Sequence, residues 1–362
     1  MGFARRVKPK IIYNKKDISQ DIAPYLKGFS YTDELSGSAD DISITLDDCD
    51  KLWQGDWMPI KGDTLEVSLI SLYWHSTNEQ AIEFQLGTFE IDEIELKKSP
   101  TEVTIKAVSV PNDTTLRGVE RSRSWEKVSV WKIATDIASD AQFELFWDCK
   151  ENPNVDRIEQ TEQSDLSFLQ KLCSDNGLAL KVSDKKIIIF DETKYEEAET
   201  VAIFSKIPII QSTDTQSNNA EGNQEQTKLN IYRFLNYGFS TSIRDVYKSC
   251  RVIYQKGKDK EKIDVTFTDP KKDNGKILIC HNQVDSIVEA ENMAKKELRK
   301  KNQGEVKGKL SLHGDFSYAA GLTYDIQGFG YFDGKYIATR VTHELSSGYT
   351  CNIDLRRCLD GY

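Results

Sequence analysis

Two stretches, KGDTLEVSL at residues 61–69 and AGLTYDIQG at residues 320–328, share one pattern at opposite ends of a 362-residue chain. Each has a glycine second, a threonine two residues later, and then apolar and polar residues in alternation. Such alternation is typical of a strand that buries one face. Internal similarity of this kind predicts a duplicated architecture. The aligned pairs are Gly62 with Gly321, Thr64 with Thr323, Leu65 with Tyr324, Glu66 with Asp325 and Val67 with Ile326.

The alignment continues into the next two strands of each copy. GTFEIDEIEL at 87–96 lies on GKYIATRVTH at 334–343, and, with one residue inserted, VTIKA at 103–107 lies on CNIDL at 351–355. The glycines that begin the first two matched strands are 25 positions apart in copy one and 13 in copy two. Copy one therefore carries a longer loop. We predict two copies of one β-fold that bracket a different middle segment.

The residues up to Pro111 are dominated by strand signals, and the pattern changes after that proline. Two helices are predicted next: SVWKIATDIASDAQ, with Ser129 as its N-cap, and QSDLSFLQKLCSDNG, with Ser164 as its N-cap and Gly177 just past its end. LALKVSDKKIIIF then has the pattern of a β-hairpin that turns at Ser183–Asp184. The middle segment is therefore expected to be a small α/β domain.

Residues 211–228, QSTDTQSNNAEGNQEQTK, contain one apolar residue, which is too few for a packed element. Strands return in YKSCRVIYQK, EKIDVTFTD and GKILICHN, and a helical pattern follows from Ser286. The fold class expected is mainly β, with two related antiparallel β-barrel (tube) domains around an α/β insertion. The expected segments are a first barrel at 1–111, the α/β domain at 112–200, a polar flexible linker at 201–228, and a second barrel at 229–362 with a helical excursion near 285–302.

The charge and hydropathy of the chain argue against several partners. The formal net charge is −10, whereas nucleic-acid-binding surfaces collect Lys and Arg into patches. The densest basic run, KKELRKKN, continues the helical pattern from Ser286 and is interpreted as a solvated helix end. No apolar run approaches the roughly 18 residues of a membrane span, and the N-terminus lacks the apolar region of a secretory signal. We expect no stable nucleic-acid binding and no membrane insertion.

Metal, cofactor and disulfide signatures are missing from the sequence. The seven cysteines form no C-x-x-C pair, and the four histidines lie far apart, so we expect no metal site and free, mostly buried thiols in a reducing cytoplasm. No P-loop and no G-x-G-x-x-G between a strand and a helix is present, and no cofactor is expected. GFGYFDGKY at 328–336 links two predicted strands and is interpreted as a hairpin.

Catalytic motifs are also missing: no G-x-S-x-G elbow and no H-E-x-x-H occurs. His343 could be a general base, but no acid or nucleophile can be assigned to it. We favour the alternative, a strand histidine that makes a structural hydrogen bond. The sequence thus predicts no catalytic residue.

The acidic stretch DDCDKLWQGDWMP at 47–59 admits several interpretations. Its carboxylates could serve a glycosidase, but no cleft signature accompanies them. Calcium is disfavoured because Leu52 and Trp53 occupy positions where an EF-hand loop needs a glycine and a carbonyl turn. Trp53 and Trp57 could form a sugar-binding platform, or they could cover one end of a barrel, which is the commoner use of such residues. Since this stretch has no equivalent in copy two, we place Trp53, Asp56 and Trp57 at a subunit or tube interface.

Three segments together resemble the late-control D family of phage tail proteins, the baseplate hubs of contractile tails. They are FSYTDELSGSADDISITLDDCDKLWQGDWMPIKGDTLEVSL at 29–69, TEQSDLSFLQKLCSDNGLALKV at 161–182 and FDGKYIATRVTHELSSGYTCNIDLRRC at 332–358. The middle segment is also similar to type VI secretion spike proteins. The resemblance implies two related barrels around an α/β insertion, and trimers in which six similar barrels form a pseudo-sixfold ring.

Such a ring would join a hexameric tail tube to a trimeric central spike, in a phage tail or a phage-tail-like bacteriocin. The partners implied are the chain itself, the tube protein, the spike or puncturing protein, and other baseplate and tape-measure proteins. Assembly in the bacterial cytoplasm is expected. Because the chain ends at LRRCLDGY, we expect wall digestion to belong to separate partners. The alternatives are a peptidoglycan-active tail enzyme that uses Asp56 or Asp63, and a glycan-binding β-module.

Overall fold

The computed structural model confirms a mainly β chain with a few helices. It describes residues 5–74, 76, 78–98, 101–110, 116–206, 234–255, 262–284 and 286–362. The chain folds into two compact units. The first comprises Met1–Thr193, Gly314–Ala320 and Thr339–Ile353, and the second comprises Lys194–His313, Gly321–Ala338 and Asp354–Tyr362.

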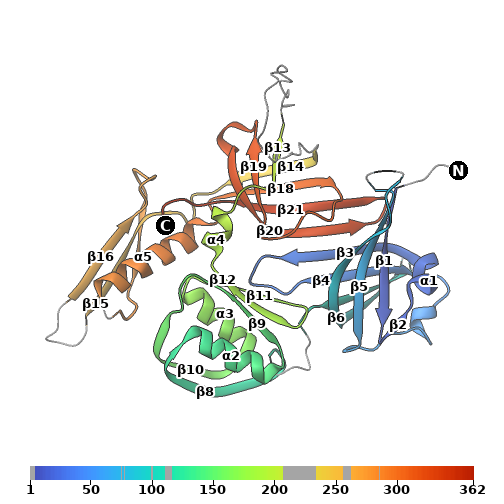
Figure 1. The fold of residues 1–362 in the computed structure, drawn as a ribbon, viewed down its shortest axis with the longest axis horizontal. Coiled ribbons are helices and arrows are strands. Elements are labelled where there is room, and N and C mark those ends of the chain that lie inside the picture. Colours follow the sequence, from blue (N-terminus) through green and yellow to red (C-terminus); the bar gives the residue numbers. More distant parts are fainter. Residues whose placement is uncertain are drawn as a thin grey trace, which may run out of the picture. The chain divides into compact units, whose positions relative to one another are not determined.

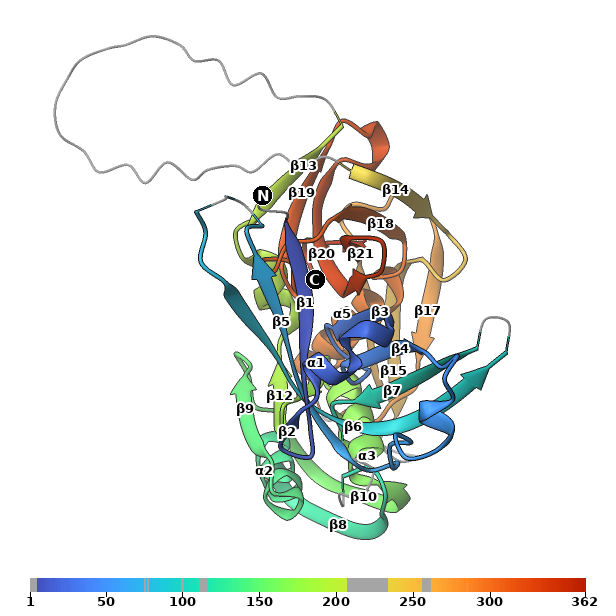
Figure 2. The same ribbon diagram turned by 90° about the vertical axis from the view of Figure 1, so that its right-hand side faces the viewer.

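An antiparallel sheet forms the N-terminal part of the first unit, and Figure 2 shows its strands β1 and β5 side by side. Alternate residues of β4, namely Ile42, Ile44 and Leu46, are buried, which is the expected period of two. Residues 340–345 of β20 (Gly334–Leu345) pair with β3. The strand order is β20-β3-β4-β7-β6-β5-β1-β2. The elements are β1 (Arg6–Tyr13), β2 (Lys16–Asp17), α1 (Ser19–Ile22), η1 (Ala23–Tyr25), β3 (Leu26–Glu34), β4 (Asp41–Asp47), η2 (Leu52–Gln54), β5 (Thr64–Leu72), β6 (Ile82–Lys97) and β7 (Glu102–Val108).

The α/β part of the first unit has two helices between a three-stranded sheet and a two-stranded ribbon (Figure 1). The helices bury Ile133, Ile137, Leu169 and Leu172 in a common core with the sheet strands. The sheet has the order β11-β12-β9, and the ribbon pairs β10 with β8. The elements are β8 (Glu120–Ser129), α2 (Val130–Ala141), β9 (Glu144–Asp148), β10 (Asn154–Ser164), α3 (Asp165–Asp175), β11 (Ala179–Ser183) and β12 (Lys186–Phe190).

The predicted helix ends are confirmed. The side chain of Ser129 accepts a hydrogen bond from the backbone N–H of Lys132, and Ser164 accepts one from the N–H of Ser167, both at 3.3 Å. Gly177 follows α3 with φ +70°. The hairpin turn lies one residue later than predicted, because the residues with positive φ are Asp184 and Lys185 (46° and 59°).

One half-buried lysine ties the α/β part to the sheet of the first unit. Lys181 of β11 contacts the carboxylates of Asp33 and Asp40, the latter at 3.2 Å, and donates to the carbonyl of Glu34 at 2.8 Å. Burial lowers the pKa of Lys181, but the two aspartates together raise it above its ordinary value. These contacts join the segments predicted as a first barrel (1–111) and an α/β domain (112–200). Residues of both segments lie in the same compact unit.

In the second unit, the strand order is β14-β18-β21-β20-β19-β13, with β20 and β21 each contributing part of their length to both units. The expected linker at 201–228 begins with a strand. Its residues 202–205 form β13, which pairs in parallel with β19. The remainder of that linker, from residue 207 onward, lies outside the described residues. The elements are α4 (Glu192–Glu197), β13 (Ala202–Ser205), β14 (Phe234–Thr241), β18 (Val306–His313), β19 (Thr323–Gln327), η3 (Gly330–Phe332) and β21 (Tyr349–Arg357).

A separate three-stranded sheet corrects the prediction that three strands after the linker belong to the second barrel. β15 (Tyr247–Gln255) pairs antiparallel with β16 (Lys262–Thr268) and in parallel with β17 (Lys276–Cys280). Helix α5 (Ile287–Asn302) packs on it and buries Ala290, Ala294 and Leu298. The predicted Ser286 cap is confirmed, since its side chain accepts from the N–H of Glu289 at 3.1 Å. This sheet has a hydrophobic core of its own.

The predicted duplication is confirmed at the level of strand register. Thr64 pairs with Glu90 and Val67 with Gly87 in copy one, as Thr323 pairs with Ile337 and Ile326 with Gly334 in copy two. The glycine turns match as well. Gly62 (φ +90°) donates its N–H to the carbonyl of Ile91, and Gly321 (φ +86°) donates to that of Ala338, both at 2.9 Å. Each of these pairs follows from the sequence alignment without adjustment.

Replacing Gly62 by alanine is expected to lower the free energy of unfolding by about 1–2 kcal/mol, because an L side chain is strained at this positive φ. No atom lies within 4 Å of the added Cβ, so the backbone alone is responsible. Gly348→Ala is the control, since that position is equally open and has no positive φ. Urea unfolding of the two variants measures the difference, and equal stabilities would contradict the assignment.

Candidate functional site

The acidic stretch of copy one forms a loop that holds a 3₁₀ turn between β4 and β5. Asp48, 1% exposed, accepts a hydrogen bond from the backbone N–H of Trp53 at 3.1 Å and one from the side-chain amide of Gln54 at 2.9 Å. Asp47 accepts from the N–H of Cys49 at 2.9 Å. Hydrogen bonds from the Cys49 side chain, from Lys27 and from this backbone N–H lower the pKa of the Asp47 carboxyl. These two aspartates therefore stabilise the loop itself.

Two tryptophans of this loop pack edge to face with each other and with Tyr25 of η1. The ring centroids of Trp53 and Trp57 lie 5.5 Å apart at an interplanar angle of 82°, and Tyr25 lies 5.2 Å from Trp53 and 5.9 Å from Trp57. Trp53 is 3% exposed and Trp57 is 41% exposed. Because only one of the two indole rings is accessible, Trp53 and Trp57 do not form a platform of two exposed rings. Trp53 instead covers one end of the sheet's interior, as the other interpretation predicted.

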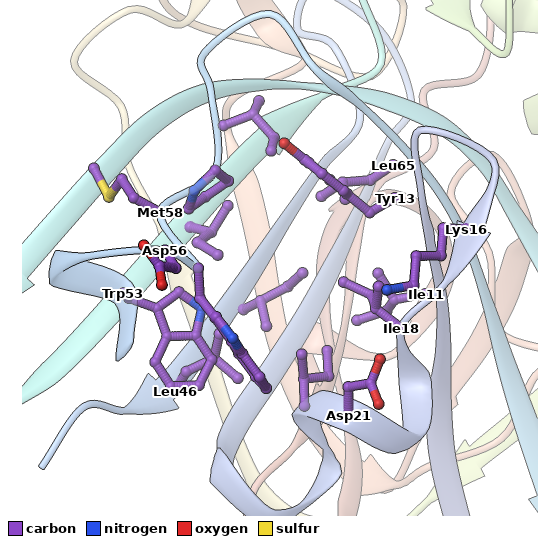
Figure 3. Close-up of a pocket in the computed structure, with 16 residues that line it drawn as sticks. Ile11, Tyr13, Lys16, Ile18, Asp21, Leu46, Trp53, Asp56, Met58 and Leu65 are labelled. Atoms are coloured by element: carbon purple, nitrogen blue, oxygen red, sulfur yellow. The ribbon is translucent and has the colours of Figure 1, made fainter. Parts of the chain in front are cut away.

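An open cavity of about 350 Å³ lies beneath the rings of Trp53 and Trp57. Figure 3 shows Trp53 over one side of it, with Lys16 and Asp21 on the other side and Asp56 beside the tryptophan. Its apolar wall comes from α1 and from five strands of the first sheet or the loops beside them. The wall residues are Ile11, Ile18, Ile22, Ile44, Leu46, Leu65, Ile91 and Ile105.

The loop also presents apolar side chains to solvent next to the cavity. Trp57, Met58 and Ile60 are 41%, 49% and 68% exposed. Contiguous exposed apolar residues commonly mark an interaction site. We call these three residues the apolar lip. Trp57 was predicted from the sequence to lie at an interface, whereas Met58 and Ile60 were not, although both are apolar residues in a polar loop.

Asp63, considered for an enzymatic role, is engaged elsewhere. It accepts a hydrogen bond from the hydroxyl of Tyr13. That bond holds the pKa of Asp63 below its ordinary value, while burial and the same bond raise the pKa of Tyr13. A general acid of a glycosidase needs a raised pKa. Asp63 therefore has the wrong protonation state for that role at neutral pH.

His343 makes the structural hydrogen bonds that the sequence favoured. It is 1% exposed, its Nδ1 lies 2.7 Å from the hydroxyl of Tyr349, and its Nε2 lies 3.2 Å from the carbonyl of Tyr318. Nε2 therefore carries the proton, which it donates to the carbonyl. Burial lowers the pKa of the imidazole. Cys351, 3.2 Å from Nδ1, is also fully buried, so neither side chain reaches a substrate.

The described residues hold no group of three or more His, Cys, Asp and Glu side chains placed for a metal ion. The seven cysteines are free, but the expectation that most are buried is wrong: three are buried, three are half-buried and Cys49 is exposed. In the part of the chain that the structure describes, no helix is long and apolar enough to cross a membrane.

No protein-family model matches the chain. A probable baseplate hub protein of Escherichia phage 186 is 27% identical over 205 residues, which cover 56% of this chain and 48% of that protein. The probable baseplate hub protein of Escherichia phage P2 is 28% identical over 182 residues, 49% of this chain and 43% of that protein. The chain is similar to phage baseplate hub proteins. It spans about half the length of these relatives.

Solved structures share the fold over nearly the whole chain. A tail protein from Neisseria meningitidis MC58 superposes with a TM-score of 0.68 at 13% identity, covering 97% of this chain and 96% of its own. The 43 kDa tail protein of prophage MuSo2 from Shewanella oneidensis gives 0.69 at 11% identity, covering 97% and 98%. The E. coli c3393 protein, a component of the type VI secretion system, gives 0.53 at 11%, covering 93% and 75%. The chain thus shares the fold of these phage tail proteins.

The two tryptophans of the loop should differ in their effect on stability. Trp53→Ala is expected to lower the free energy of unfolding by about 3 kcal/mol or more, because it removes a buried ring and its packing partners. Trp57→Ala should cost less than about 1 kcal/mol, because the ring is largely solvated. Chemical denaturation measures both. A large loss on Trp57→Ala would show that the ring is part of the core.

Acid should destabilise the first unit through His343. Its pKa is lower in the folded than in the unfolded chain, so the unfolded state binds the proton first as pH falls below about 6.5. The contribution to stability is complete at pH 7.5 and should fall by up to about 1.4 kcal/mol by pH 5.5. His343→Gln, which keeps a donor and an acceptor, should lose less over the same range. Equal pH slopes in urea unfolding would contradict this assignment.

Proposed function

We propose that this chain is the baseplate hub protein of a contractile phage tail or of a phage-tail-like bacteriocin. The observation that carries the proposal is the duplicated β-structure, which repeats one strand register within a chain that is similar in sequence to phage hub proteins. Three such chains have six similar β-structures. A ring of six can match a hexameric tube on one side while its true threefold symmetry matches a trimeric spike on the other.

The hub acts by assembly, with no catalytic residue. Its partners are other copies of the chain, the tail tube protein, the central spike, and other baseplate and tape-measure proteins. It assembles in the bacterial cytoplasm and becomes part of the tail baseplate. The engaged state of Asp63 and the buried state of His343 support a structural rather than an enzymatic role.

The apolar lip and the cavity beside it form the candidate assembly surface, together with Asp56. Two features support this assignment: the exposed apolar side chains, which are costly in a free chain, and the confinement of the whole loop to copy one. Interfaces are enriched in Trp and Met, and a few such residues supply most of the binding energy. This surface would contact a neighbouring subunit or the tube protein.

The oligomeric state tests the hub itself. Light scattering of the purified chain should give three chain masses, and electron imaging should show a ring with six similar lobes. The measurement is repeated in the presence of a tail tube protein and a central spike protein from the same source. A chain that stays monomeric at all concentrations and joins neither protein would overturn the proposal.

The assembly surface has a matched test. Trp57→Ala should weaken either trimerisation or tube binding at least tenfold, the effect typical of a central interface tryptophan. Trp131→Ala on α2 is the control, because its ring is similarly exposed, at 44% against 41%, but lies outside the proposed surface. Equal behaviour of the two variants in both assays would remove Trp57 from the interface.

A further inference from the structure

The cavity of copy one is a place where the two copies differ. Leu65 lines the cavity, and the aligned residue of copy two is Tyr324. Tyr324 is 1% exposed, and its ring packs 5.0 Å from that of Phe204, which is fully buried. Aromatic side chains thus fill the interior of copy two beside a position where copy one has a smaller leucine and an open cavity. The shared strand register does not require such an opening.

Charged groups lie on the rim of the apolar cavity. Lys16, Asp21 and Asp56 line it, and all three are exposed. Among the described residues, neither carboxylate has an ion pair or hydrogen bond, and the lysine has none either. One positive and two negative charges leave the rim with a net charge of −1. The rim therefore favours a ligand with a positive group.

The aromatic side of the opening favours the same charge. Trp57 is exposed next to Asp56, and the face of an indole ring attracts a lysine or arginine head group. Met58 lies on the same rim, and its flexible thioether can adapt to different apolar shapes. The opening thus combines an apolar interior with an acidic and aromatic edge.

From these observations we propose that the cavity binds an apolar side chain of a partner polypeptide that carries lysine or arginine beside that side chain. The volume of about 350 Å³ is at the small end of ligand pockets, which suits one anchoring segment. A polypeptide is favoured over a small molecule because the apolar lip extends outward past the cavity, where only a larger partner covers it. The inference rests on the proposed function in that the partner is a neighbouring protein of the particle.

Peptide binding to the purified full chain tests this. The probe is acetyl-Gly-Arg-Leu-Phe-Arg-Gly-amide, which contains no tryptophan, and the signal is the change in the chain's tryptophan fluorescence. Saturable binding is expected, at least tenfold tighter than to acetyl-Gly-Glu-Leu-Phe-Glu-Gly-amide. The difference should shrink as salt is added, because the rim charges are solvent-exposed. Absence of saturable binding, or equal binding of the two peptides, would overturn the inference.

Two variants identify the site. Leu65→Tyr introduces the residue of copy two and should fill the cavity, which would weaken binding of the basic peptide at least tenfold. Asp21→Asn with Asp56→Asn should remove the preference for the basic peptide, while Asp50→Asn is the matched control because Asp50 is an exposed aspartate of the same loop that does not line the cavity. Unchanged binding by the double variant would overturn the inference even if Leu65→Tyr does not fold.

The peptide assay and the oligomer assay fail independently. A trimer that does not bind the basic peptide would refute the cavity inference and leave the hub proposal standing. A chain that stays monomeric and joins neither the tube nor the spike protein, but binds the peptide at this cavity, would refute the hub proposal alone. Measuring the mass of each variant alongside peptide binding separates the two results.

Discussion

The two β-structures depend on one backbone constraint, the paired hydrogen bonds at the glycine turns. In copy one, Gly62 donates to the carbonyl of Ile91 and Ile91 donates back to the carbonyl of Asp63, each at 2.9 Å. In copy two, Gly321 donates to Ala338 and Ala338 to Leu322 at the same distances. A slip of one residue at either place would turn every buried side chain of the strand outward. The register, and with it each interior, is therefore fixed where the strand begins.

Many of the acidic residues that made the loop at 47–63 look like a chemical site serve this local framework. Asp48 accepts from the backbone of the 3₁₀ turn, Asp47 accepts from Cys49, and Asp63 accepts from Tyr13. Asp47 and Asp48 satisfy backbone donors that the turn cannot pair internally, and Asp63 binds the hydroxyl of Tyr13 at the end of β1. The density of aspartates thus follows largely from turn chemistry. Turn chemistry does not account for Asp56, which lies at the rim of the cavity and faces solvent.

The sequence predicted what depends on neighbouring residues and on repetition. Helix caps such as Ser129, Ser164 and Ser286 were predictable because a cap bonds to a backbone group three residues away. The register of copy two was predictable because copy one repeats it. The sheet of β15, β16 and β17 was not, because β17 pairs in parallel with β15, and no local pattern selects a partner strand. Trp53 and Trp57 were equally hydrophobic in sequence, and only long-range packing buries one and exposes the other.

A duplication held by backbone hydrogen bonds allows its side chains to diverge. The turn and ladder bonds of β5 and β6 use main-chain groups, so Leu65 and Tyr324 occupy equivalent positions without disturbing the register. Side-chain differences between the two copies can then accumulate in their interiors and in the loop at 47–59, while both copies keep the same backbone framework. In the proposed ring, six similar frameworks would satisfy a sixfold partner, and the differences between the two copies would alternate around it. In that ring, only differences that alternate between the two copies can distinguish a threefold partner from a sixfold one. The open cavity of copy one is such a difference, so it bears more on partner recognition than the features that both copies share.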